Sequence, residues 1–263
     1  MIYCFSGTGN SLSVARWMAE RMNEQVCNIP NTQVKTEDIS KEKCVLFVFP
    51  VYAWGIPKVV KDFIKMLPNV KTQPPTFVVF TCGDDMGMAD KVLQAQLQRR
   101  GWKLNDAFSV IMRETYICLP CFDIDRREVE EKKRDQAKQR ALQIADYVIK
   151  LCKKPFTQHV AGSYFHSNRL TRGSMPWIKS YLVRPLFNMF LMSDRRFHVN
   201  KQSCLHCEKC SKTCPLRNIS IVDSLPHWNG HCTHCLRCYH VCPNHAIEYG
   251  FFTKGKGQVK INF

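Results

Sequence analysis

Long apolar runs are absent from the sequence. No stretch approaches the roughly 18 consecutive apolar residues that a membrane-spanning helix needs. The first residues lack the basic and apolar stretches of a secretory signal, because Gly7, Gly9 and Asn10 interrupt them. No low-complexity tract or solenoid repeat appears. We therefore expect a cytoplasmic globular protein without a transmembrane segment. Since thiols stay reduced in the cytosol, its 15 cysteines indicate metal binding rather than disulfide bonds.

Acidic residues are scarce in the second half of the chain. Residues 150–263 contain 4 acidic and 17 basic residues, residues 1–149 contain 18 and 21, and the formal net charge of the chain is +16. Such a charge is typical of proteins that bind nucleic acid, membranes or acidic proteins. The sequence has no recognisable base-reading helix or aromatic RNA-binding platform, so we expect no nucleic-acid partner.

Short apolar runs alternate with helical stretches through residues 1–151. Fully apolar strands between helices indicate a parallel sheet covered on both faces. The expected strands are 1–5, 25–29, 44–49, 76–82 and 107–112, and the expected helices are 11–23, 57–66, 88–100 and 125–151. The sequence thus predicts a doubly wound α/β domain over residues 1–151.

A basic and aromatic connector, residues 152–196, follows this domain. Within it, residues 174–192 are apolar at most positions, with Pro185 near the middle. We expect short helices that pack a C-terminal domain, residues 197–263, against the α/β domain, since such interfaces need apolar surface. A peripheral membrane helix is the alternative.

A loop of glycine and small polar residues, FSGTGNS (5–11), follows the first predicted strand. Gly7 and Gly9 would let the backbone approach a ligand closely, and successive N–H groups at a helix start suit an anion such as phosphate. The loop does not fit the pattern G-x-x-x-x-G-K-[ST] and is too short for a dinucleotide fingerprint; a tight turn is the alternative. The candidate phosphate-binding residues are Ser6, Gly7, Thr8, Gly9, Asn10 and Ser11.

Two further loops would lie beside this one, at the carboxyl ends of strands, where open α/β sheets bind ligands. FPVYAWGIP (49–57) supplies aromatic side chains and TCGDDMG (81–87) a glycine turn, which together suit a flat, hydrogen-bonding ring. In this order, the three loops resemble those of the flavodoxins. The resemblance implies FMN as the cofactor and the strand order 2-1-3-4-5. It also implies that the flavin ring is bound by Pro50, Val51, Tyr52, Ala53, Trp54, Gly55, Thr81, Cys82, Gly83, Asp84 and Asp85.

Two cysteine runs, CLHCEKCSKTCP (204–215) and CTHCLRCYHVCP (232–243), share the pattern C-x2-C-x2-C-x3-C-P. CxxC pairs can also hold zinc, which is the alternative. The compact, duplicated spacing resembles bacterial-type 4Fe–4S ferredoxins, in which three close thiolates bind one cluster and the fourth binds the other. It predicts two 4Fe–4S clusters in a small α+β domain. The expected ligands are a first set, Cys204, Cys207, Cys210 and Cys242, and a second set, Cys232, Cys235, Cys238 and Cys214.

Two further cysteines, two histidines and one tyrosine lie outside the predicted ligand sets. Cys118 and Cys121 form a third CxxC, which we interpret as ordinary loop thiols rather than a redox pair or metal site. His206 and His234 occupy equivalent places in the two runs and are interpreted as donors to cluster sulfur rather than ligands. We assign no catalytic residue; Tyr116 is the best candidate proton donor.

The chain as a whole, including RRFHVN (195–200), resembles the flavodoxin–ferredoxin hybrid proteins of anaerobic bacteria and archaea. The resemblance implies electron transfer between two 4Fe–4S clusters and FMN. If each of the two clusters and the FMN phosphate carries a charge of about −2, a net charge of roughly +10 remains on the protein. This charge favours an acidic electron carrier or redox enzyme as partner. The alternative is an FMN-dependent reductase that passes electrons from its own clusters to a small acceptor, either neutral or anionic.

Overall fold

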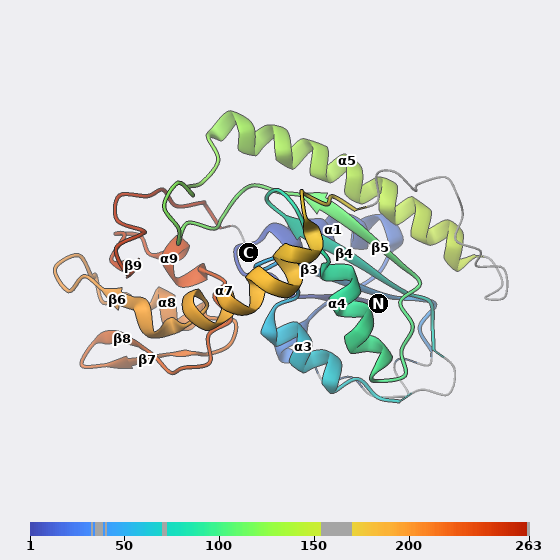
Figure 1. Cartoon of the computed structure of the whole chain (residues 1–263), viewed down its shortest axis with the longest axis horizontal. Helices are drawn as coiled ribbons and strands as arrows, with labels where there is room; N and C mark the ends of the chain where they lie inside the picture. The colour runs from blue at the N-terminus through green and yellow to red at the C-terminus, as the bar shows by residue number, and fades with distance from the viewer. Residues whose placement is uncertain (33, 35–38, 40, 70–72, 154–169, 262–263) are drawn as a thin grey trace.

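The computed structural model of the protein describes residues 1–32, 34, 39, 41–69, 73–153 and 170–261 (Figure 1). Its larger part contains a parallel sheet in the order β2-β1-β3-β4-β5. This order confirms the expected doubly wound, flavodoxin-like fold. The strands are β1 (Ile2–Cys4), β2 (Val26–Asn28), β3 (Val45–Pro50), β4 (Thr76–Cys82) and β5 (Asp106–Ile111).

Helices cover both faces of this sheet. They are α1 (Asn10–Met22), α3 (Lys58–Lys65), α4 (Ala89–Gln98) and α5 (Arg127–Cys152), with a short 3-10 helix η1 (Ile29–Asn31) after β2. Within β3, Phe47 packs in a core with residues of α3 and α4, whereas Leu46 packs in a second core with residues of α1 and α5. Because successive strand side chains point to opposite faces, burial on both faces explains the continuous apolar runs.

The C-terminal region, residues 197–261 of the described chain, lies beside the sheet (Figure 1). It consists of two antiparallel pairs, β6 with β9 and β7 with β8, and two short helices. These features match the expected small α+β ferredoxin domain. The elements are β6 (Phe197–Val199), α8 (Lys209–Lys212), β7 (Ile219–Val222), β8 (Leu225–Trp228), α9 (Arg237–Val241) and β9 (Ile247–Tyr249), preceded by the 3-10 helix η5 (Asp194–Arg196).

A third apolar core joins this region to the segment after β5. Ile117 and Cys118, both fully buried, pack with Phe197, Tyr239 and other residues of the C-terminal region. Cys118 is therefore a core residue, while its partner in the CxxC pattern, Cys121, is exposed. The division of the chain at residues 151 and 196 stays a prediction.

The connector is helical from Pro176 to Leu191; residues 154–169 lie outside the described residues. It comprises α6 (Pro176–Ile178), the π-helical turn η4 (Lys179–Val183) and α7 (Arg184–Leu191). Polar side chains hold it to the sheet domain: Ser180 and Arg184 are buried against the loop after β3. Large apolar side chains such as Trp177 and Leu182, each 61% exposed, point outward. The expected apolar packing is thus largely replaced by polar contacts. None of the helices in the described chain is both long and apolar enough to cross a membrane.

Candidate functional site

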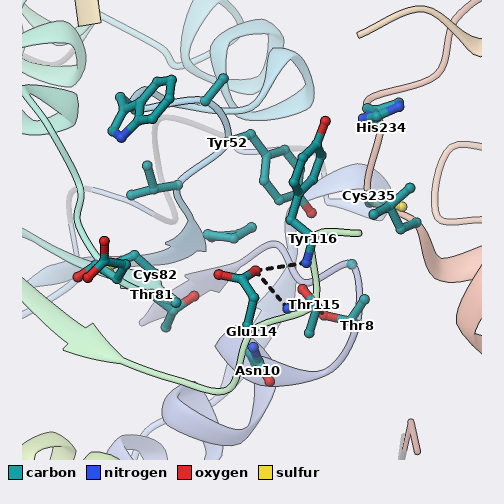
Figure 2. A pocket seen from close by; sticks show the side chains of 18 of the residues that line it. Thr8, Asn10, Tyr52, Thr81, Cys82, Glu114, Thr115, Tyr116, His234 and Cys235 are labelled. Carbon is teal, nitrogen blue, oxygen red and sulfur yellow. Dashed lines mark hydrogen bonds between the residues drawn. The ribbon is translucent and has the colours of Figure 1, made fainter. Parts of the chain in front are cut away.

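A cavity of about 350 Å³ opens at the carboxyl ends of the sheet strands, where all three predicted flavin loops meet (Figure 2). The phosphate loop, the loop after β3 and the loop after β4 each contribute to its wall. The structure brings together every predicted flavin-binding residue except Gly9 and Gly55. The residues on the wall are Ser6, Gly7, Thr8, Asn10, Ser11, Pro50, Val51, Tyr52, Ala53, Trp54, Thr81, Cys82, Gly83, Asp84 and Asp85.

The phosphate loop presents backbone N–H groups at the start of α1. Gly9 has a φ of 98°, a left-handed conformation that favours glycine, and its N–H donates to Ser6 Oγ at 3.1 Å. Among the described residues, the N–H groups of Gly7, Thr8 and Asn10 meet no protein acceptor. These three donors, together with the N-terminus of α1, form an arrangement suited to an anion.

The side chains of this loop are not equally available to a ligand. The Asn10 amide donates to the Arg113 carbonyl at 2.9 Å, and its oxygen accepts from Arg113 Nε at 3.2 Å. Ser11 Oγ lies 2.7 Å from Thr81 Oγ1. Thr8 makes only a long contact, 3.5 Å, with the hydroxyl of Thr115. Thr8 is therefore the side chain best placed to bond a phosphate, and Asn10 instead links the loop to the segment after β5.

The loop after β3 is a tight turn supported by the connector. Tyr52 and Gly55 exchange backbone hydrogen bonds of 2.9 and 3.1 Å, and Ala53 and Trp54 between them have φ values of 46° and 54°. Positive φ at both central residues is the geometry of a type I′ turn. The Ser180 hydroxyl donates to the Trp54 carbonyl at 2.8 Å, so the turn that supplies the predicted ring-binding residues is held in place by η4.

Two glycines of the flavin loops leave room for side chains of the protein. A Cβ at Gly55 would collide with the Arg184 guanidinium, which donates to the Ile56 carbonyl at 2.9 Å. A Cβ at Gly83 would collide with the carboxylate of Glu114. Gly55 therefore leaves room for the Arg184 guanidinium against the turn, and Gly83 leaves room for the Glu114 carboxylate next to the loop after β4.

Residues that sequence reasoning did not place in the pocket complete its wall. Glu114 accepts hydrogen bonds of 2.8 Å from the N–H groups of both Thr115 and Tyr116 (Figure 2). The segment after β5 could have been anticipated, since it leaves the same edge of the sheet. The others come from elements far away in sequence, with no local signal. The additional residues are Arg113, Glu114, Thr115, Tyr116, Leu119, Phe122, Lys179, Phe187, Met192, His234, Cys235 and Leu236.

Tyr116 and His234 bring buried polar side-chain groups to this wall. Neither the Tyr116 hydroxyl nor either ring nitrogen of His234 has a hydrogen-bond partner among the described residues. Their rings lie 6.1 Å apart. Burial raises the pKa of Tyr116 far above its usual value and lowers the pKa of His234 to about 4, so the phenol is protonated and the imidazole neutral at neutral pH. Both groups can therefore donate a hydrogen bond to a ligand.

The eight predicted cluster ligands fall into the two expected groups. The first set, Cys204, Cys207, Cys210 and Cys242, lines one small cavity between α8 and β9. In the second set, burial raises the pKa of Cys238, and the thiolates of Cys235, Cys232 and Cys214 raise it further. Among the described residues, no three His, Cys, Asp or Glu side chains converge on a single ion position. Four thiols in each set equal the number of ligands that a 4Fe–4S cluster takes.

The backbone repeats itself around the two cysteine runs. Left-handed φ values occur at three pairs of non-glycine residues: His206 and His234, Glu208 and Leu236, and Arg217 and His245. The N–H groups of Asn218 and Ala246 donate to the fourth cysteine of each run, Cys214 and Cys242, at 3.3 and 3.2 Å. The sequence duplication is therefore a duplication of structure. The His234 N–H donates to Cys232 Sγ at 3.2 Å, so its backbone, and not its ring, contacts a cluster cysteine.

The second set lies directly against the flavin pocket. Cys235 is part of the pocket wall. An added Cβ at Gly7 would lie 2.7 Å from the Cys235 Cβ and 2.6 Å from the Tyr52 hydroxyl. Gly7 is thus required by two neighbouring protein groups, whereas we expected it to admit the ligand.

Comparisons with known proteins find two families along the chain. Residues 1–115 match the family described as a flavodoxin domain, and residues 226–248 match the family described as a 4Fe-4S binding domain. A search of the curated proteins found no match. A Streptococcus pneumonia TIGR4 flavodoxin is 15% identical, with a TM-score of 0.36 over 56% of this chain and 96% of that one. An azoreductase from Bacillus anthracis str. Sterne is 10% identical, with a TM-score of 0.38 over 56% and 98%.

The two family matches fall on the parallel sheet with its loop-lined pocket and on the region that carries the second cysteine run. The first of these domains binds flavin and the second an iron–sulfur cluster. The chain is therefore a flavodoxin–ferredoxin hybrid, an electron-transport protein that joins a flavodoxin domain to a 4Fe–4S domain.

Proposed function

We propose that the protein transfers electrons between two 4Fe–4S clusters and FMN, and that an acidic redox partner docks at its basic C-terminal region. The position of Cys235 carries this proposal, because a predicted cluster ligand shares the pocket wall with all three predicted flavin loops. Clusters exchange single electrons and flavin can hold one or two, so the pair can connect one-electron and two-electron reactions.

The residues present fit these groups. The free N–H groups at the start of α1 suit the FMN phosphate, and Tyr52 and Trp54 suit its ring. Each set of four thiolates suits one cluster. The first set does not line the flavin pocket, and its Cys207 is exposed. The proposed order is therefore partner, first set, second set and FMN, or the reverse.

The docking proposal rests on charge around the first set. Lys201, Lys209 and Lys212 are exposed and lie close to Cys207 in the sequence. Glu208 pairs with Lys212 at 3.0 Å, which leaves this part of the surface basic. Complementary charge mainly accelerates encounter, so the electron-transfer rate should fall as ionic strength rises.

A second candidate is direct reduction of a small aromatic acceptor in the flavin pocket. Tyr116 and His234 favour it, because their unpartnered groups could bind the acceptor. Tyr116→Phe separates the two functions. If neutral or anionic aromatic acceptors bind there, the substitution should slow their turnover. If they do not, it should change neither their turnover nor electron transfer to a protein acceptor.

The proposed function is tested by anaerobic reconstitution. We expect about eight irons and one FMN per chain. In rapid mixing with a one-electron donor, Cys207→Ser should impair delivery from the donor, and Cys235→Ser should impair transfer to FMN. Stoichiometric zinc, or no flavin after reconstitution, would overturn the assignment.

A further inference from the structure

Arg237, the first residue of α9, connects the C-terminal region to the phosphate loop. Its Nε donates to the Gly7 carbonyl and its Nη2 to the Ser6 carbonyl, both at 2.5 Å. Its Nη1 donates to the Thr213 carbonyl at 3.0 Å, beside Cys214. One planar guanidinium therefore holds two successive peptide groups of the loop and fixes them to the C-terminal region.

The direction of these bonds determines where the loop's N–H groups point. In a trans peptide, the carbonyl of one residue and the N–H of the next point in opposite directions. Because Arg237 holds the carbonyls of Ser6 and Gly7 on its own side, the N–H groups of Gly7 and Thr8 must face away from it. Neither of these N–H groups meets a protein acceptor among the described residues, and both residues line the pocket.

We propose that Arg237 is a positioning residue for phosphate binding: it orients the Gly7 and Thr8 N–H groups toward the FMN phosphate without touching the phosphate itself. This inference rests on the proposed function, since it takes FMN as the ligand of the pocket. A preorganised donor gains affinity because less order has to be imposed on binding. The C-terminal region thus completes the flavin site of the other domain.

The position of Arg237 makes this contact sensitive to the adjacent cysteines. Arg237 lies between Cys235 and Cys238 of the second set, at the start of α9. The first set has no comparable link, because the structurally equivalent position in the first run is Lys209, which is exposed. Loss of the second set should therefore weaken phosphate binding, and loss of the first set should not.

The test compares FMN with riboflavin, which lacks the phosphate. Dissociation constants are measured by flavin fluorescence under anaerobic conditions for wild type, Arg237→Met and Arg237→Lys, with cluster absorbance recorded for each. Arg237→Met should weaken FMN binding by about tenfold or more and change riboflavin binding by less than about twofold. Arg237→Lys keeps the charge but loses the fork, so it should also weaken FMN selectively. Arg195→Met is the matched control, since it removes an exposed positive charge in η5, just before the C-terminal region.

The affinities of the two variants test the role of Arg237 directly. Equal losses for FMN and riboflavin, or full FMN affinity in Arg237→Lys, would overturn the inference, because the first indicates general damage and the second an effect of charge alone. If Arg237→Met loses its clusters, the FMN and riboflavin affinities of Arg237→Lys test the inference in its place. Wild-type protein that binds no FMN would refute the proposed function. A wild-type preference for FMN over riboflavin that persists in both variants would refute only the role of Arg237.

Discussion

Replacing Gly7 with alanine should weaken FMN binding, because the loop is held between two other groups. The added Cβ would lie 2.6 Å from the Tyr52 hydroxyl, 2.7 Å from the Cys235 Cβ and 3.0 Å from the Cys235 carbonyl oxygen. Comfortable carbon contacts begin near about 3.5 Å, so the loop or Cys235 must move by roughly 1 Å. Overpacking of this kind costs about 1–3 kcal/mol.

If that cost falls on the flavin-bound form, the FMN dissociation constant should rise by about 5- to 150-fold. Fluorescence titration of the anaerobic protein measures it, and Tyr52→Phe provides the control. Tyr52→Phe removes the nearer contact, so in the Gly7→Ala background it should restore part of the affinity, whereas alone it should change little. Gly7→Ala protein with wild-type FMN affinity and thermal stability would show that Cys235 does not press on the loop.

Three further predictions concern the same junction. Thr8→Ala should reduce FMN affinity by about tenfold or more and leave riboflavin affinity unchanged, since a hydrogen bond to a charged group contributes about 1.5–3 kcal/mol. Asn10→Ala should affect both flavins alike, because the Asn10 amide is bonded to Arg113. The opposite pattern of affinities would reverse these two roles. Cys207→Ser should remove one cluster and leave FMN bound, whereas Cys235→Ser should also weaken FMN; electron paramagnetic resonance and flavin content report both, and identical phenotypes would contradict the assigned order. Burial raises the pKa of Cys118 to about 12, so iodoacetamide near pH 8 should alkylate exposed Cys121 and spare Cys118, as mass spectrometry of the native protein would show; equal labelling would place Cys118 outside the core.

Much of the architecture was predictable because short stretches of sequence show characteristic patterns of apolar residues, glycines and cysteines. Residues 44–49 and 77–80 are apolar at every position, which is typical of strands buried on both faces of a sheet. Ligand loops follow such strands at the same sheet edge, so three separate stretches could be placed in one pocket. The duplicated cysteine spacing likewise predicted two groups of thiols from residues far apart in sequence.

The junction was not predictable, because it depends on contacts between distant segments. Nothing near Gly7 indicates that Cys235 will lie against it, or that Arg237 will bond its carbonyl. In the connector, the apolar composition predicted short helices that pack the two domains together. The short helices are present, but Ser180 and Arg184 donate hydrogen bonds to backbone carbonyls of the loop after β3, which the composition did not indicate. Hydrogen-bonding needs at the flavin loops therefore decided which face of the helix is buried.

The repeated left-handed residues of the cysteine runs have a consequence for folding. Six non-glycine residues in this conformation store roughly 1–3 kcal/mol each, a total comparable to the roughly 5–15 kcal/mol that stabilises a whole domain. Among the described residues, two short strand pairs, two short helices and a small apolar core oppose this strain in the C-terminal region. Ligand coordination is folding free energy where the site does not exist in the unfolded chain. Iron supply would then decide whether α9 forms at all, so that a newly made chain in an iron-starved cell would carry a folded sheet domain with a loosely structured tail.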